Sequence, residues 1–427
     1  MPREEINTAQ FYGLGIAPNL LNRLEELGFK HPTPIQHKAI PIAISGEDVI
    51  GIAQTGTGKT LAFSLPMIQQ ISAKKKTGLI LLPTRELAVQ VEETLRKVAG
   101  GLGLRTAILI GGTAMNPQIK QLRAKPHIIV ATPGRLIDHM EQRFANLSNV
   151  GVLVLDEADR MLDMGFAPQL KRILSTIPAD RQTMLFSATM PPEIAAIAKT
   201  YMKSPLRVEV APAGSVAEKV DQEVYIVPKN DKTALLERLL IEYKGTVLVF
   251  TRTKHGASKL ARSLRTINIG VAEIHSNRSQ NQRQDALKGF SNGRYRVLVA
   301  TDIAARGIDV KNIELVVNYD LPDHTEDYVH RIGRTGRAGS TGKAISFAVP
   351  EQKRDIKQIE RLIRKSLNVK TPEGELVQQS QEFKDARPES SGRGRQGGRQ
   401  SGYPPRKGGQ NRNNRERRPY QPKNERT

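Results

Sequence analysis

Short runs of apolar residues recur along the chain between segments with the periodicity of helices. Six runs occupy the first half, at Asp48–Ala53, Leu79–Leu82, Ala107–Ile110, Ile128–Ala131, Val152–Leu155 and Met184–Phe186. Six more follow, at Val224–Val227, Val247–Phe250, Val271–Ile274, Val297–Ala300, Leu315–Asn318 and Ala344–Val349. Continuous apolar runs of this length are typical of buried parallel strands joined by crossover helices. The pattern therefore predicts two α/β domains.

The segment between the two series, Tyr201–Lys219, contains Pro205, Pro212 and Gly214 and has the composition of a linker. We assign residues 1–207 to the first domain, 208–219 to the linker, 220–370 to the second domain and 371–427 to a tail. The two halves show no close sequence repeat, so any likeness between them is expected to be architectural.

The charge balance indicates a polyanionic partner. The 427 residues include 65 Lys and Arg against 43 Asp and Glu, a net charge of +22 with a pI near 10.1. Nucleic acid is the first candidate, and an acidic membrane surface is the alternative. Cysteine is absent, which excludes disulfides and thiolate metal sites, so a metal would need oxygen ligands. With no signal-peptide core and no apolar stretch of about 18 residues, we expect a soluble cytoplasmic protein without a membrane span.

The tail differs from the rest of the chain in composition. Gly, Arg, Gln, Asn and Pro dominate Ser391–Thr427, which carries 11 basic residues against 2 acidic ones. Such a segment lacks the apolar residues of a core, which predicts disorder. Together with Tyr403 and Tyr420, the charges favour a flexible arm that holds nucleic acid, and improved solubility is the alternative role.

A glycine-rich segment after the first apolar run has the setting of a phosphate-binding loop. It consists of Ala53, Gln54, Thr55, Gly56, Thr57, Gly58, Lys59 and Thr60, and a helix is predicted to follow it. The glycines let backbone N–H groups approach phosphate oxygens. Lys59 would hold the β- and γ-phosphates of a nucleotide, and Thr60 would bind Mg²⁺. Ala53 stands where the usual pattern has its first glycine.

Two carboxylates follow the apolar run Val152–Leu155. Asp156 and Glu157 lie where a buried strand ends, and ligands gather at that edge of α/β sheets. Asp156 is suited to hold Mg²⁺, and Glu157 to orient and deprotonate an attacking water. An acidic run after a strand is usually a solvated loop or a helix cap, and only its partnership with the phosphate loop favours the catalytic interpretation.

At this point the chain resembles the DEAD-box RNA helicases, because Asp156-Glu157-Ala158-Asp159 spells the motif that names the family. The likeness covers about Phe11–Ala348 and implies two RecA-like domains, ATP and Mg²⁺ as cofactors, and RNA as the partner. Gly28–Gln36 is similar to the family's adenine-reading motif, with Phe11 as its upstream aromatic and Phe29 inside it. Gln36 can both donate and accept hydrogen bonds at an adenine edge, which would select ATP over GTP.

The resemblance also implies an RNA-binding surface on the first domain, and a coupling motif. The RNA-binding residues are Pro83, Thr84, Arg85, Gly111, Gly112, Thr132, Pro133, Gly134 and Arg135. Their hydroxyls, guanidiniums and amides suit phosphate and 2′-OH groups, which position a strand without reading its sequence. Ser187, Ala188 and Thr189 are assigned by resemblance to coupling between ATP hydrolysis and strand separation.

In the second domain the resemblance assigns Arg252, Gln280, Arg283 and Thr301 to RNA. Gly307 and Asp309 would meet the nucleotide. Arg334 and Arg337 are similar to the family's arginine fingers, which neutralise charge on the γ-phosphate in the transition state. This division of the site between two domains implies that only a closed form hydrolyses ATP. The closed form would also clamp single-stranded RNA and open short duplexes.

Two other functions fit part of the pattern. A translocating DNA helicase shares the phosphate loop and arginine fingers but should lack Gln36 and the Asp156–Asp159 spelling. A non-enzymatic RNA chaperone or scaffold would act mainly through the basic tail. The predicted contacts go to the RNA backbone and so do not select one RNA. By family analogy, the protein would act in ribosome assembly, RNA decay or cold adaptation. Proteins of ribosome assembly or RNA decay would then be its partners. The short N-terminus and the tail are similar to bacterial members, the RhlE-like subgroup among them.

Overall fold

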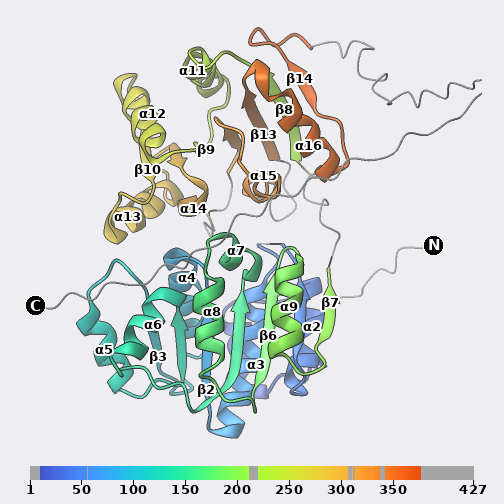
Figure 1. Cartoon of the computed structure of the whole chain (residues 1–427), viewed down its shortest axis with the longest axis vertical. Helices are drawn as coiled ribbons and strands as arrows, with labels where there is room; N and C mark the ends of the chain where they lie inside the picture. Colours follow the sequence, from blue (N-terminus) through green and yellow to red (C-terminus); the bar gives the residue numbers. More distant parts are fainter. Residues whose placement is uncertain are drawn as a thin grey trace, which may run out of the picture. The chain divides into compact units, whose positions relative to one another are not determined.

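Two seven-stranded parallel sheets, each covered by helices, form the fold of the protein (Figure 1). The computed structural model describes residues 10–54, 56–210, 220–305, 310, 313–336 and 342–376. Every pairing between these strands is parallel. The predicted class, tandem RecA-like α/β domains, is therefore confirmed. Within the described residues, no helix is both long enough and apolar enough to cross a membrane.

The first sheet has the strand order β3-β4-β2-β5-β6-β1-β7. Its strands are β1 Val49–Ile52, β2 Thr77–Leu81, β3 Thr106–Leu109, β4 Ile128–Ala131, β5 Val150–Asp156, β6 Gln182–Ser187 and β7 Leu206–Glu209. Its helices are α1 Pro18–Glu26, α2 Pro34–Ile44, α3 Lys59–Lys74, α4 Arg85–Val98, α5 Met115–Arg123, α6 Pro133–Glu141, α7 Ala158–Asp163, α8 Ala167–Leu174 and α9 Pro192–Tyr201. Both faces of this sheet are buried. Ile80 packs into one apolar cluster, and its neighbours Leu79 and Leu81 pack into another, because successive side chains point to opposite faces.

The second sheet has the order β10-β11-β9-β12-β13-β8-β14. Its strands are β8 Val220–Ile226, β9 Val247–Phe250, β10 Val271–Ile274, β11 Val297–Ala300, β12 Leu315–Asn318, β13 Gly342–Ala348 and β14 Asn368–Lys370. Its helices are α11 Lys232–Glu242, α12 Lys254–Thr266, α13 Gln280–Ser291, α14 Asp302–Ala305, α15 Thr325–Ile332 and α16 Lys353–Ile363, with the 3₁₀ turn η1 at Pro350–Gln352. Counted from β8, the order repeats that of the first sheet, so the two halves do share one architecture.

All twelve predicted strands are present, but β7 and β14 were not predicted. In β7 only Val208 is buried, and β14 has no buried residue, so neither strand shows an apolar run. Both lie at a sheet edge, where one side of the backbone needs no strand partner. Strand β7 carries the first sheet through Glu209, into the segment predicted as linker. The remaining linker residues 211–219 and the tail from 377 lie outside the described residues.

Candidate functional site

The glycine-rich loop lies between β1 and α3, as a phosphate-binding loop requires. Gly56 and Gly58 have φ angles of 86° and 91°, a left-handed conformation that favours glycine. The side chain of Lys59 is buried, and its Nζ donates to the carbonyl of Ala53 at 3.0 Å. The hydroxyl of Thr57 donates to the carbonyl of Gln54 at 2.7 Å. The loop is therefore folded around the lysine ammonium, while Thr55 lies outside the described residues.

Gln36 is attached to this loop. Its Oε1 accepts from the backbone N–H of Thr33 at 2.9 Å, and its Nε2 donates to the carbonyl of Gly58 at 2.9 Å. A Cβ at Gly58 would lie 2.4 Å from the Gln36 Nε2, so this approach requires glycine. A glutamine amide has two donor hydrogens and two acceptor lone pairs. One donor and one acceptor therefore remain for a ligand.

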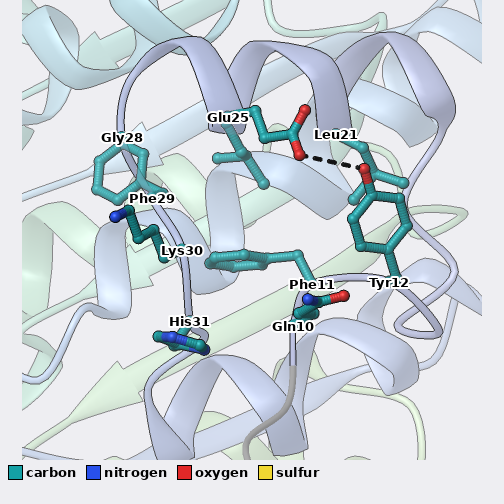
Figure 2. A pocket seen from close by; sticks show the side chains of 10 residues that line it. Gln10, Phe11, Tyr12, Leu21, Glu25, Gly28, Phe29, Lys30 and His31 are labelled. Carbon is teal, nitrogen blue, oxygen red and sulfur yellow. Dashed lines mark hydrogen bonds between the residues drawn. The ribbon is translucent and has the colours of Figure 1, made fainter.

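Phe11 and Phe29 line one cavity of about 320 Å³, together with Tyr12, Glu25 and other residues of the N-terminal segment. Figure 2 shows the Phe11 ring between Phe29 and Tyr12, and the hydroxyl of Tyr12 donates to Glu25 at 3.4 Å. Phe11 is buried at 4% exposure, whereas Phe29 is 39% exposed at the rim. The two predicted aromatic residues thus share a cavity, and Phe29 offers an accessible ring face. Gln36 does not line this cavity.

The two carboxylates lie at the end of β5 and are both buried. Burial raises the pKa of Asp156 to about 6, although the charge of Lys59 acts to lower it and that of Glu157 to raise it. Glu157 has a left-handed backbone with φ 52° and forms an ion pair with Arg160 at 2.7 Å. Glu157 and Arg160 are 3% and 1% exposed, so neither charge is free to move into water. A buried carboxylate with a raised pKa beside a lysine is a frequent feature of functional sites.

Asp159 joins the acidic segment to the end of β6. Its Oδ2 accepts from the backbone N–H groups of Ala188 and Thr189, at 3.1 and 2.9 Å, and from the Thr189 hydroxyl at 3.0 Å. Its own N–H donates to the Ser187 hydroxyl at 3.2 Å. The three residues predicted to couple hydrolysis to strand separation are therefore tied to the acidic segment. The sequence assigned no individual role to Asp159.

The predicted RNA-binding residues of the first domain gather at one edge of its sheet. They follow the neighbouring strands β3, β4 and β2, whose carboxyl ends meet at that edge. Thr84 caps α4 by accepting from the Leu87 N–H at 3.3 Å. A Cβ at Gly112 would lie 1.8 Å from the Arg85 guanidinium, so only glycine lets that side chain lie against the loop. Pro133, Gly134 and Arg135 form the first turn of α6, directly after Thr132.

A buried amide supports the loop that holds Gly111 and Gly112. The Nε2 of Gln118 faces the carbonyl of Ile110, the hydroxyl of Thr113 and the carbonyl of Ala114, at 3.0, 2.7 and 3.2 Å. Its Oε1 lies 3.1 Å from the Nε2 of His139, which is fully buried. Since the amide nitrogen faces three oxygens, Oε1 must be the acceptor and His139 the donor. The sequence predicted neither residue.

His139 is neutral in this arrangement. Burial lowers its pKa, and the nearby charge of Arg135 lowers it further, against the opposite effect of Asp138. Arg135 also holds the loop from the other side, because its Nη1 donates to the carbonyl of Thr113 at 3.1 Å. The loop between β3 and α5 is thus fixed from both α5 and α6.

The predicted residues of the second domain occupy loop and helix starts around its sheet. Arg252 follows β9 and forms an ion pair with Asp323 at 3.1 Å. Thr301 follows β11, and Gln280 and Arg283 lie in the first turn of α13. Arg334 follows α15, and its Nε donates to the carbonyl of His330 at 3.2 Å. Gly307, Asp309 and Arg337 lie outside the described residues.

Arg331 lies in the same basic block as Arg334 but has a structural environment. It is 2% exposed, and its guanidinium forms two bonds with Asp302, at 2.5 and 2.6 Å. It also donates to the side chain of Asn318 and to the carbonyl of Asp320, at 3.2 and 2.6 Å. Arg331 therefore fastens α15 to α14 and β12.

The first parallel sheet carries a phosphate loop after β1 and paired carboxylates at the end of β5. A second sheet with the same strand order follows it. Together these features define a P-loop protein with two RecA-like lobes. Residues 33–197 match the family described as DEAD/DEAH box helicase, and residues 231–339 match the helicase conserved C-terminal domain. The chain belongs to the DEAD-box helicase family.

Relatives and solved structures agree with this assignment. The chain is 42% identical over 365 residues to the DEAD-box ATP-dependent RNA helicase CshA of Geobacillus kaustophilus, covering 85% of this chain and 78% of that one. It is 39% identical over 414 residues to the ATP-dependent rRNA helicase RRP3 of Candida albicans, covering 92% and 78%. The structure of S. cerevisiae Dbp5 bound to RNA and ADP BeF3 superposes with a TM-score of 0.77 at 30% identity, covering 85% of this chain and 96% of that one. Mss116p bound to ssRNA and AMP-PNP also gives 0.77 at 30% identity, covering 84% and 77%.

Proposed function

We propose that the protein is an ATP-dependent RNA helicase, in which RNA-stimulated ATP hydrolysis is coupled to closure of the two lobes on single-stranded RNA and to local opening of short duplexes. The observation that carries this proposal is the arrangement of the first lobe. Its phosphate loop, with the buried Lys59, and its buried carboxylates lie at the ends of β1 and β5, and Asp159 ties the carboxylates to the segment Ser187–Thr189. Chemistry at the phosphate loop can therefore act on the lobe that carries the RNA-facing loops.

Each part of the chain has a role in this proposal. Lys59 binds the β- and γ-phosphates, and Phe29 with Gln36 binds the adenine. Glu157 accepts a proton from the attacking water, while its ion pair with Arg160 fixes the carboxylate in one orientation. The second lobe supplies Arg334, and by resemblance Arg337, to neutralise charge that develops on the transferred phosphoryl group.

The donor set fits Mg²⁺. Thr60 and Asp156 offer the hard oxygen ligands that this ion prefers. Burial raises the pKa of Asp156, and a bound cation would favour the charged form of its carboxylate. We propose that Thr60 and Asp156 hold the ion. When bound, Mg²⁺ neutralises negative charge on the phosphates.

The proposal is tested by comparing Lys59→Ala with Arg334→Ala in the purified full-length protein. We expect Lys59→Ala to weaken ATP binding and abolish RNA-stimulated ATPase, because its ammonium contacts the ground-state phosphates. Arg334→Ala should leave ATP binding nearly intact and reduce turnover by roughly 10³-fold or more, as is typical of arginine fingers. Undiminished turnover in Lys59→Ala would disprove the site. An equal loss of ATP binding and turnover in Arg334→Ala would make Arg334 a ground-state ligand.

A further inference from the structure

The shared strand order gives each strand of the first lobe a counterpart in the second, so that β1, β2 and β5 correspond to β8, β9 and β12. The registers align these strands residue by residue. Leu81 of β2 pairs with Leu155 of β5, and Phe250 of β9 pairs with Asn318 of β12. The helices after β2 and β9 are both capped by a threonine. Thr84 lies three residues after Leu81, and Thr253 lies three residues after Phe250.

A second set of pairings gives the same alignment. Ile52 of β1 pairs with Ser187 of β6, and Ile226 of β8 pairs with Ala348 of β13. The loop after Ile226 therefore corresponds to the phosphate loop of the first lobe. The two residues after Asn318, Tyr319 and Asp320, correspond to Asp156 and Glu157.

The second lobe keeps part of the phosphate site at these positions. Helix α11 begins with Lys232 and Thr233, as α3 begins with Lys59 and Thr60. Lys232 is 4% exposed, and its Nζ donates to the carbonyl of Tyr319 at 2.8 Å and to Asp320 at 3.1 Å. A buried lysine thus meets a carboxylate at the ends of corresponding strands.

The second lobe also lacks two parts of that site. The loop Val227–Asp231 contains no glycine and is one residue shorter than Ala53–Gly58, so it cannot form the same cradle of backbone N–H groups. Tyr319 stands at the position of the magnesium ligand Asp156, and its hydroxyl lies 2.9 Å from that of Thr233. These changes remove the features that hold a nucleoside triphosphate with its metal.

A cavity of about 530 Å³ nevertheless opens at this position. Its lining includes the cations Lys229, Lys232, Arg252 and Lys259 and one carboxylate, Asp320. Lys232 is paired with Asp320, and Arg252 with Asp323. Lys229 and Lys259 are both exposed and form no ion pair with another described residue. The excess positive charge in a concave site favours an anion.

We propose that this cavity binds a phosphate group through Lys229 and Lys259, without Mg²⁺ and without hydrolysis. The group could come from a small phosphorylated ligand or from the RNA backbone, and Arg252 at the cavity wall is itself a predicted RNA contact. In either case the second lobe would bind an anion beside the position that corresponds to the phosphate loop of the first lobe.

The test uses pyrophosphate as the probe and the full chain carrying Lys59→Ala, which disables the site of the first lobe. Binding is measured by calorimetry in EDTA, where no metal can bridge the anion. We expect Lys229→Ala/Lys259→Ala to weaken pyrophosphate binding at least about tenfold, since charged contacts contribute more than 1.4 kcal/mol. The matched control is Lys353→Ala/Lys365→Ala, which removes two exposed lysines from α16 and the residues after it and keeps the same net charge.

A second arm distinguishes the two sources. Affinity for single-stranded oligouridine is measured against salt concentration with Lys59 intact and AMP-PNP present. If RNA supplies the phosphate, the log–log slope of the cavity variant becomes shallower than that of the control by about 0.7 per lost contact. If a small ligand supplies it, pyrophosphate binding is lost and the RNA slope is unchanged. Equal pyrophosphate affinities together with equal RNA slopes for the cavity and control variants would overturn the proposal. This holds whether both variants keep the parent's values or both lose affinity to the same extent.

Discussion

Single residues of the acidic segment carry separable tasks. Asp156 faces the phosphate loop, Glu157 is paired with Arg160, and Asp159 holds the backbone of Ala188 and Thr189. A substitution at one of these positions should therefore disturb one step of the cycle more than the others.

Glu157→Gln tests the proposed base. The amide keeps the shape of the side chain but cannot accept a proton, so we expect ATP and RNA to remain bound while hydrolysis slows by about 10²–10⁴-fold. Single-turnover hydrolysis and equilibrium RNA binding, measured on the same preparation, separate the two effects. Normal hydrolysis in this variant would remove Glu157 from the mechanism. Arg160→Lys is the companion variant, because it keeps the positive charge and loses only the fixed guanidinium geometry.

At the scale of elements, the loop between β3 and α5 depends on a side chain that no motif contains. Gln118 provides the donors that hold Ile110, Thr113 and Ala114, and His139 orients the amide. If Gly111 and Gly112 meet RNA, the network acts on RNA binding through the position of this loop.

Gln118→Met should raise the RNA concentration for half-maximal ATPase stimulation by roughly tenfold, the equivalent of one lost hydrogen bond, with the KM for ATP and the maximal rate within about twofold. His139→Phe should give a smaller rise, because it removes the donor and keeps a ring beside Phe144. His139→Gln restores an N–H donor and should recover part of the loss. A fall in the maximal rate alone, matched by a lower melting temperature, would show a merely structural role.

A second network fixes the end of β10. Burial alone would raise the pKa of Glu273, but hydrogen bonds from Ser258, His275 and Arg278 outweigh that effect and lower it to about 2. The folded pKa thus lies below the ordinary value of 4.5. The charged form therefore stabilises the fold above pH 4.5, and this stabilisation disappears as the pH falls towards 2.

Glu273→Gln should lower the free energy of unfolding at pH 7 by about 1.5–3 kcal/mol, the range for hydrogen bonds to a charged group. The difference from the parent should shrink between pH 4.5 and pH 2. Urea unfolding at a series of pH values measures it, with the exposed Glu351→Gln as the control. A difference that stays constant over that range would show that the charge of Glu273 does not contribute.

The predictability of these elements follows from how local their signals are. The twelve predicted strands were visible as apolar runs, and the phosphate loop as a short glycine pattern. The edge strands β7 and β14 were not, because an edge strand with few buried positions has the composition of a loop. Gln118 and His139 come from separate helices and meet only in the folded chain, so no spacing along the sequence predicts their contact. Arg331 and Arg334 look alike in sequence and are both buried, and the ion pair with Asp302 identifies Arg331 as structural.

For the whole molecule, a site divided between two lobes implies that ATP and RNA favour each other's binding through closure. Linkage requires the effect to be reciprocal, so RNA must tighten ATP binding by the same factor by which ATP tightens RNA binding. We expect the basic tail to contribute to RNA binding independently of closure, since every proposed catalytic residue precedes Ala338.

Deletion of Ser391–Thr427 tests that contribution. We expect ATPase at saturating RNA to be nearly unchanged and RNA affinity to fall at low salt. The slope of log affinity against log salt should become shallower by up to about 0.7 for each lost single-strand contact. Identical affinities and slopes for the full-length and shortened proteins would assign the tail to solubility or to protein partners.

The strand order also sets when the nucleotide site can form during synthesis on the ribosome. Strand β1, the first strand to emerge, lies between β6 and β7. Its start is fixed by Asp48, whose carboxylate accepts from the N–H groups of Thr183 and Lys203, both at 2.6 Å. The phosphate loop that follows β1 therefore lacks its neighbours until about Glu209 has left the exit tunnel. A nascent chain would therefore bind nucleotide only once the sheet of the first lobe is complete. At that point the second lobe is still being synthesised.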